Sequence, residues 1–157
     1  MTKGDTVKYS HDDAELVGQP VGYWTWAANK VLLAHVRGRL AAIGITQPQW
    51  WALHQVLHGA TGATRAEVIR DQQANLDVGP GLAPDIDLLV ERELLVEDED
   101  GRLQITDAGR TLHRRAAETQ RENRARVHAG IADEEYLITL KVLQRMIHNA
   151  GGDLTAV

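Results

Sequence analysis

The sequence predicts a mostly α-helical protein that carries one small β-hairpin, and three observations lead to this fold class. Two short helical patterns follow one another within residues 64–93. A hairpin pattern comes directly after them, within residues 94–106. Longer helical patterns flank this unit on both sides, and their apolar faces are broader than a lone surface helix needs.

The two short helices have recognisable starts. Thr64 and Glu67 have the spacing of a capping box, in which each side chain satisfies an exposed amide of the other residue, so a helix begins at about Arg65. We expect a break around residues 77–81 and then a second helix. The apolar residues of this second helix are spaced three and four apart and predict one buried stripe: Leu82, Ile86, Leu89 and Val90.

The hairpin and the helix after it complete a known arrangement. The apolar run 94–96 and the alternating run 103–105 flank Asp100-Gly101, a dipeptide that accepts the positive φ of a two-residue or bulged turn. Thr106 can cap the following helix. Two helices followed by a hairpin are the order of a winged helix-turn-helix. In that arrangement residues 81–93 are the recognition helix and residues 94–106 are the wing.

Composition and charge limit the function classes. The 157 residues suffice for one domain with a proper core, or for one domain plus an elaborated dimer interface. No apolar run reaches the roughly 18 residues of a membrane span, and residues 1–20 have no secretory apolar core, so we expect a cytoplasmic protein. The absence of cysteine excludes disulfides and thiolate metal sites within this chain. The net charge of −5 means that a nucleic-acid binder must find its positive charge locally.

The predicted parts of the chain follow from helix starts and stops. They are a flexible arm (1–20), a first dimerisation helix (21–45), the winged helix-turn-helix (46–110), a connecting helix with a second dimerisation helix (111–150) and a tail (151–157). Gly44 ends the first helix, and Thr46 with Gln49 forms a second capping box. The long helix runs to about His128, and Asp133 caps the last helix.

The first and last helices carry apolar residues without a partner in the neighbouring sequence. These residues are Trp24, Val31, Tyr136, Leu140, Leu143 and Ile147. The economical interpretation is that both helices pack against the same helices of a second copy, which predicts a two-fold homodimer.

Residues 45–116 resemble the MarR family of bacterial transcription regulators, and residues 131–147 resemble the dimerisation end of that family. The most specific matches are residues 44–50 (GITQPQW) and 101–110 (GRLQITDAGR). The resemblance covers roughly residues 22–150. It implies a homodimer that lays one recognition helix per subunit in successive major grooves of double-stranded DNA. It also implies, for many members, a small phenolic or other aromatic ligand that lowers DNA affinity.

The recognition helix and the wing depart from the pattern of that family. Ala83, Pro84 and Leu88 stand where the family usually offers hydroxyl residues and arginines. Residues 81–100 hold eight acidic side chains and one basic one, a net charge of −7 that repels phosphates. The alternative is therefore a winged-helix dimer that has lost specific DNA binding and acts as a small-molecule sensor or protein-interaction module. A DNA mimic is a more distant third.

Positive charge lies outside that acidic stretch. Residues 109–126 hold six arginines and two glutamates, a net charge of +4 that forms either a solvated face with local ion pairs or a surface that contacts phosphates. The predicted DNA-binding residues are Arg65, Arg70, Ala83, Pro84, Asp85, Leu88, Arg102, Arg110 and Arg114.

Aromatic residues and histidines gather near the starts of the first two long helices. We interpret them first as core and dimer packing, and alternatively as a pocket for a small aromatic ligand. The residues of this predicted pocket are Tyr23, Trp24, Trp50, Trp51, His54 and His58.

His54 and His58 share one helix face, a spacing that can hold a metal when a third ligand arrives. Because the sequence shows no third ligand beside them, we assign them a structural role, regard His113 as a partly buried polar residue, and expect neither a metal nor a cofactor. The sequence also lacks a Gly-x-Ser-x-Gly motif, and its single serine is Ser10, so we expect no enzyme.

Overall fold

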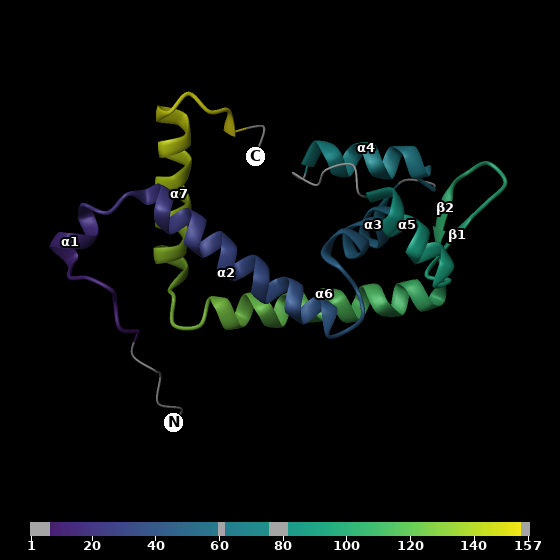
Figure 1. Cartoon of the computed structure of the whole chain (residues 1–157), viewed down its shortest axis with the longest axis horizontal. Helices are drawn as coiled ribbons and strands as arrows, with labels where there is room; N and C mark the ends of the chain where they lie inside the picture. The colour runs from purple at the N-terminus through teal and green to yellow at the C-terminus, as the bar shows by residue number, and fades with distance from the viewer. Residues whose placement is uncertain (1–6, 60–61, 76–81, 155–157) are drawn as a thin grey trace.

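The computed structural model describes residues 7–59, 62–75 and 82–154. Its elements are α1 (Asp13–Val17), α2 (Val21–Ala41), α3 (Gln47–His58), α4 (Arg65–Asn75), α5 (Leu82–Glu91), β1 (Leu95–Glu97), β2 (Leu103–Ile105), α6 (Asp107–Val127) and α7 (Asp133–Asn149). Figure 1 shows an elongated chain in which α3, α4, α5 and the hairpin gather at one end of the long helix α6. The beginning of α2 and the whole of α7 lie toward the other end.

The predicted helix starts are confirmed by the hydrogen bonds that cap them. Thr46 accepts from the Gln49 amide at 3.3 Å and Gln49 accepts from the Thr46 amide at 3.2 Å, so the capping box of α3 is complete. Thr64 and Glu67 make the same exchange at the start of α4. These bonds satisfy amides that the first helical turn leaves without an intrahelical partner.

The wing is a two-stranded antiparallel hairpin in which Leu95 pairs with Ile105 and Glu97 pairs with Leu103. Gly101 has the predicted positive φ, 73°. The connection spans residues 98–102 and is therefore longer than a two-residue turn. The Asp98 carboxylate organises this loop by accepting hydrogen bonds from the backbone amides of Asp100 (3.0 Å) and Arg102 (2.9 Å). These side-chain hydrogen bonds stabilise the five-residue loop.

The core lies between α3, α5, α6 and the base of the wing. Its fully buried side chains are Leu40, Ile45, Leu53, Val68, Leu82, Ile86, Leu89, Leu95 and Leu103. Three of the four predicted stripe residues of α5 are buried, and Val90 packs against the core. Gly109 in the first turn of α6 lies so close to the wing that an added Cβ would stand 2.1 Å from the Leu94 carbonyl oxygen. The start of α6 is therefore fastened directly to the hairpin.

Within the predicted arm, residues 13–17 form α1, which begins with a capping box between Asp12 and Glu15. One predicted helix start needs correction. The cap of α7 is Ala132 and not Asp133, since the Glu135 carboxylate reaches back to the Ala132 amide at 2.9 Å. The predicted break at residues 77–81 lies outside the described residues.

None of the helices in the described ranges combines the length and the apolar character that crossing a membrane would require.

Candidate functional site

The outward face of α5 is the surface that a recognition helix would present. Its exposed side chains are Pro84, Asp87, Leu88 and Glu91, spaced three, one and three residues apart. They alternate with the buried Ile86 and Leu89, so the amphipathic pattern of the helix selects them. Asp87 and Glu91 were not among the predicted site residues, although the stripe on the opposite face could have identified them.

Asp85 and Ala83, two of the predicted DNA-binding residues, do not belong to this exposed face of α5. The Asp85 carboxylate accepts a hydrogen bond from the Gln49 amide group at 3.1 Å and one from the Thr46 hydroxyl at 3.4 Å. Asp85 therefore ties α5 to the start of α3. Ala83 is half-buried as well. The outward face of α5 therefore includes the predicted Pro84 and Leu88, but neither Ala83 nor Asp85.

Arg65 connects three elements of the winged unit. Its guanidinium forms an ion pair with Asp87 of α5 and donates to Glu97 of β1 at 3.1 Å. The hydrogen bond with Asp87 is the main cause that raises the pKa of Arg65 above its ordinary value. The positive charge of Arg65 is thus directed at two carboxylates, which also lowers the effective negative charge of the recognition helix and wing.

The wing loop and the base of α4 hold two carboxylates with lowered pKa values. The Arg102 amide is the largest cause that lowers the pKa of Asp98, and the Thr64 amide is the largest cause for Glu67. The guanidinium of Arg102 donates to the Gly62 carbonyl at 3.0 Å, which fastens the wing loop to the segment before α4. Arg102, a predicted DNA-binding residue, is therefore also part of the loop structure.

The other predicted basic residues stand at the surface. Arg70 is exposed on α4 and lies 3.7 Å from the carboxylate of Asp71. Arg110 and Arg114 are exposed, one turn apart, in the first half of α6. Since α6 begins where the wing ends, these two arginines follow the hairpin directly.

The predicted aromatic pocket is not brought together within the described residues of one chain. Tyr23 and Trp24 contact each other at the start of α2, with ring centroids 5.3 Å apart. Trp50 contacts a different group, His54 and His113, at 5.9 and 6.4 Å. In Figure 1 the start of α2 lies toward α7, away from α3.

Two surface hollows are lined by residues outside the predicted aromatic pocket. One of about 340 Å³ lies between α3, α4 and the wing and is lined by Gln55, Glu67, Arg70 and Arg102 among others. One of about 280 Å³ lies between α2 and α6 and includes Arg39, Arg115 and Glu122. Both are lined largely by charged side chains, which do not match an apolar aromatic ligand.

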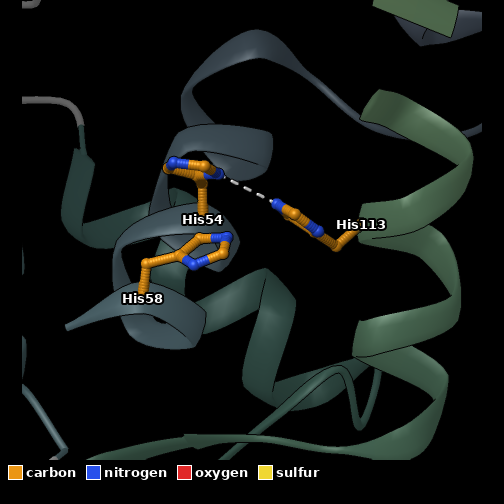
Figure 2. A group of neighbouring side chains, drawn as sticks. All are labelled: His54, His58 and His113. Carbon is orange, nitrogen blue, oxygen red and sulfur yellow. Dashed lines mark hydrogen bonds between the residues drawn. The ribbon is translucent and has the colours of Figure 1, made fainter. Parts of the chain in front are cut away.

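A cluster of three histidines joins α3 to α6 (Figure 2). His54 and His58 extend from neighbouring turns of α3, and His113 faces them from α6. Nδ1 of His54 lies 3.1 Å from Nε2 of His113. Partial desolvation is the main cause that lowers the pKa of both the surface-exposed His54 and the buried His113, and the neighbouring histidines lower it further. A lowered pKa favours the neutral form of both imidazoles. The structural role predicted for His54 and His58 rested on the lack of a third ligand, and the tertiary structure supplies His113.

Comparison with known proteins supports the fold. No protein-family model and no curated protein matches the sequence. Solved structures do match the backbone. A MarR family protein of Mycobacterium tuberculosis in complex with DNA has 23% identity and a TM-score of 0.65, covering 82% of this chain and 98% of that chain.

Two further structures agree with that match. A MarR family transcriptional regulator from Silicibacter pomeroyi has 15% identity and a TM-score of 0.67, covering 89% of this chain and 99% of that one. MepR, a transcription regulator of the Staphylococcus aureus multidrug efflux pump MepA, has 18% identity and a TM-score of 0.67, covering 84% and 99%. This chain therefore has the winged-helix fold of MarR family transcription regulators.

Proposed function

We propose that this protein is a dimeric, cytoplasmic, non-enzymatic transcription regulator of MarR type that binds double-stranded DNA. The observation that carries the proposal is the exposed face of α5 beside the wing, on a fold whose neighbours include a protein solved in complex with DNA. An exposed helix face next to a hairpin has the shape that enters a major groove while the hairpin contacts the backbone or minor groove.

Phosphate contacts come from exposed arginines around that face. Arg110 and Arg114 follow the wing, and Arg70 lies on the helix before α5. Arginines of this kind position a protein on the duplex through the phosphates, whereas the side chains of α5 would contact base edges. Because the face of α5 is acidic, binding depends on these flanking arginines more than in a basic recognition helix.

Exposed apolar side chains on the terminal helices support the dimer. On α7 the exposed large apolar residues are Leu137, Ile138, Leu140, Val142 and Met146. On α2 they are Val21, Tyr23, Trp24, Trp26, Val31 and Leu32. Apolar surface of this extent is characteristic of an interaction site. We propose that the same helices of a second copy cover it, as in a two-fold interface.

The test is fluorescence anisotropy with DNA from upstream of the protein's own gene and with a scrambled duplex, at about 50 and 200 mM salt. We expect selective binding that weakens with salt and that is lost on Arg110→Ala combined with Arg114→Ala. Arg145→Ala, on α7, is the matched control and should bind as the wild type does. Binding that is equal for both duplexes and insensitive to the arginine pair would contradict the proposal.

The acidic face of α5 favours a second candidate function. Asp87 and Glu91 repel phosphates, so the dimer could have lost specific DNA binding and become a sensor of a small aromatic molecule or a protein-interaction module. A thermal-shift screen of aromatic acids tests the sensor function, with Trp51→Ala as the variant. Stabilisation of the wild type alone, combined with feeble binding to every duplex, would favour this candidate over the regulator.

A further inference from the structure

The histidine cluster brings together three potential metal ligands that the sequence keeps in two distant segments. One ligand nitrogen from each of His54, His58 and His113 lies within 4.8 Å of the other two. The ring centroids of His54 and His58 are 4.4 Å apart, and that of His113 lies 5.3 Å from His54 and 5.8 Å from His58. Figure 2 shows the three rings converging on one small region between α3 and α6.

We propose that His54, His58 and His113 form a binding site for one divalent transition-metal ion, with Zn²⁺ as the expected occupant and one coordination position left open. The proposal stands on this cluster and is independent of whether the protein binds DNA.

The distances suit coordination by a small ion. A tetrahedral zinc with Zn–N bonds of 2.0–2.1 Å holds its nitrogen ligands about 3.4 Å apart. The His54 and His113 nitrogens already lie 3.1 Å apart, and the widest separation in the cluster, within 4.8 Å, needs to close by no more than about 1.4 Å. Rotation of the exposed side chains of His54 and His58 can close that gap, because neither side chain is held in the core.

His113 provides the fixed ligand of the site. The residue is 6% exposed, and its ring stacks on Trp50 with an interplanar angle of 19°. A ligand held in place by packing lowers the cost of ordering the site when the ion binds. The two exposed histidines then approach from a single helix face, at the spacing of one turn.

The ligand chemistry selects the class of ion. Imidazole nitrogen suits Zn²⁺, Cu²⁺ and Ni²⁺, whereas Ca²⁺ and Mg²⁺ require oxygen ligands. Three protein ligands leave the fourth tetrahedral position for water or a small anion. Since His54 and His58 are exposed, this open position faces solvent.

Because the site lies between α3 and α6, a bound ion would connect these two helices. An ion bound to all three histidines would replace the His54–His113 hydrogen bond and cross-link α3 of the winged unit to α6. Because α6 runs from the wing toward α7, the ion would stabilise the angle between the winged unit and the terminal helices. Metal binding therefore raises the unfolding temperature of the whole chain.

The experiment is Zn²⁺ titration of the tag-free full chain, first stripped with a chelator, in competition with a chromogenic zinc indicator. We expect one Zn²⁺ per chain. Loss of an outer-shell partner alone costs about 10–100-fold in metal affinity, so His58→Ala should weaken binding by at least about tenfold. His148→Ala, a histidine on α7 outside the cluster, is the matched control and should bind as the wild type does.

A second measurement separates loss of metal binding from loss of folding in the variants. Co²⁺ substituted into the wild type should produce the intense visible absorption of a tetrahedral site, and His54→Gln or His113→Gln should abolish it while circular dichroism reports whether each variant is folded. Zn²⁺ should raise the melting temperature of the wild type and of His148→Ala, and not that of His58→Ala. Equal zinc affinity in the wild type and His58→Ala, or weaker binding in His148→Ala, would overturn the proposal.

Discussion

Arg65 on α4 donates a hydrogen bond to Glu97 on β1 at 3.1 Å, and the same guanidinium pairs with Asp87 on α5. One side chain therefore links the helix before the recognition helix, the recognition helix and the wing. The arginine counts as a free positive charge in the sequence, whereas in the fold it is neutralised by two acidic neighbours.

Arg65→Ala should destabilise the winged unit by about 1 kcal/mol, because two partly exposed ion pairs are lost and their carboxylates remain without a counter-charge. Arg70→Ala on the same helix is the control, since its side chain is 71% exposed and its change should stay within about 0.5 kcal/mol. Urea unfolding followed by circular dichroism measures both. Equal stability of the two variants would mean that the Arg65 contacts contribute nothing.

Removing the acidic charges of α5 should strengthen DNA binding. We expect the double change Asp87→Asn and Glu91→Gln to raise affinity for duplex DNA by up to about 30-fold, since each of the two charges near a phosphate costs about 1 kcal/mol in water. Glu134→Gln, in the first turn of α7, is the control and should leave the affinity unchanged. Anisotropy at about 50 mM salt measures the effect. An unchanged affinity in the double variant would show that α5 does not approach DNA.

A charge in the exposed apolar face of α7 should break the proposed dimer. Leu140→Asp is expected to convert the protein from twice the 17.3 kDa chain mass to a monomer, because an aspartate cannot be buried unpaired at the interface. Val96→Asp alters a similarly exposed residue of the wing and should remain dimeric. Sedimentation velocity distinguishes the two masses. A monomeric wild type would disprove the dimer directly.

Two glycines provide a matched pair for the packing of α6 against the wing. Gly109→Ala should destabilise the fold by roughly 1–3 kcal/mol, because the new Cβ would lie 2.1 Å from the Leu94 carbonyl and 2.8 Å from the Ile105 side chain. Gly38→Ala places a methyl group within α2 where, apart from the neighbouring residues and backbone of the helix itself, no atom lies within 4 Å, so it should stabilise by up to about 1 kcal/mol. Thermal unfolding checks both signs, and a stable Gly109→Ala would refute the close contact.

Asp98 makes the wing sensitive to acid. Its pKa is lowered in the folded state, first by the hydrogen bond from the Arg102 amide, so its stabilisation is fully present above the unfolded pKa and is lost as pH falls through the folded pKa. We expect Asp98→Ala to be less stable than the wild type at neutral pH, with the difference shrinking below about pH 4. Unfolding free energies from pH 7 to pH 3 test this. A difference independent of pH would mean that the charged carboxylate is not what holds the loop.

Local signals account for the parts of the fold that the sequence determined. The capping residues Thr46, Thr64 and Thr106 act on amides within three positions of themselves, and the α5 stripe depends only on helical period. Interactions of such short range can be recognised without knowing the rest of the chain. The order of helices and hairpin follows from them, and with it the winged-helix fold.

The tertiary structure alone decided which distant side chains meet. Asp85 turns toward Gln49, and Arg65 reaches two carboxylates 22 and 32 residues away. His54 meets His113 across 59 residues because α6 packs along α3 at one particular angle and register. Helical period places His54 and His58 on one face, but it contains no information on which residue of another helix faces them. The third histidine of the proposed metal site therefore became visible only when the two helices were packed together.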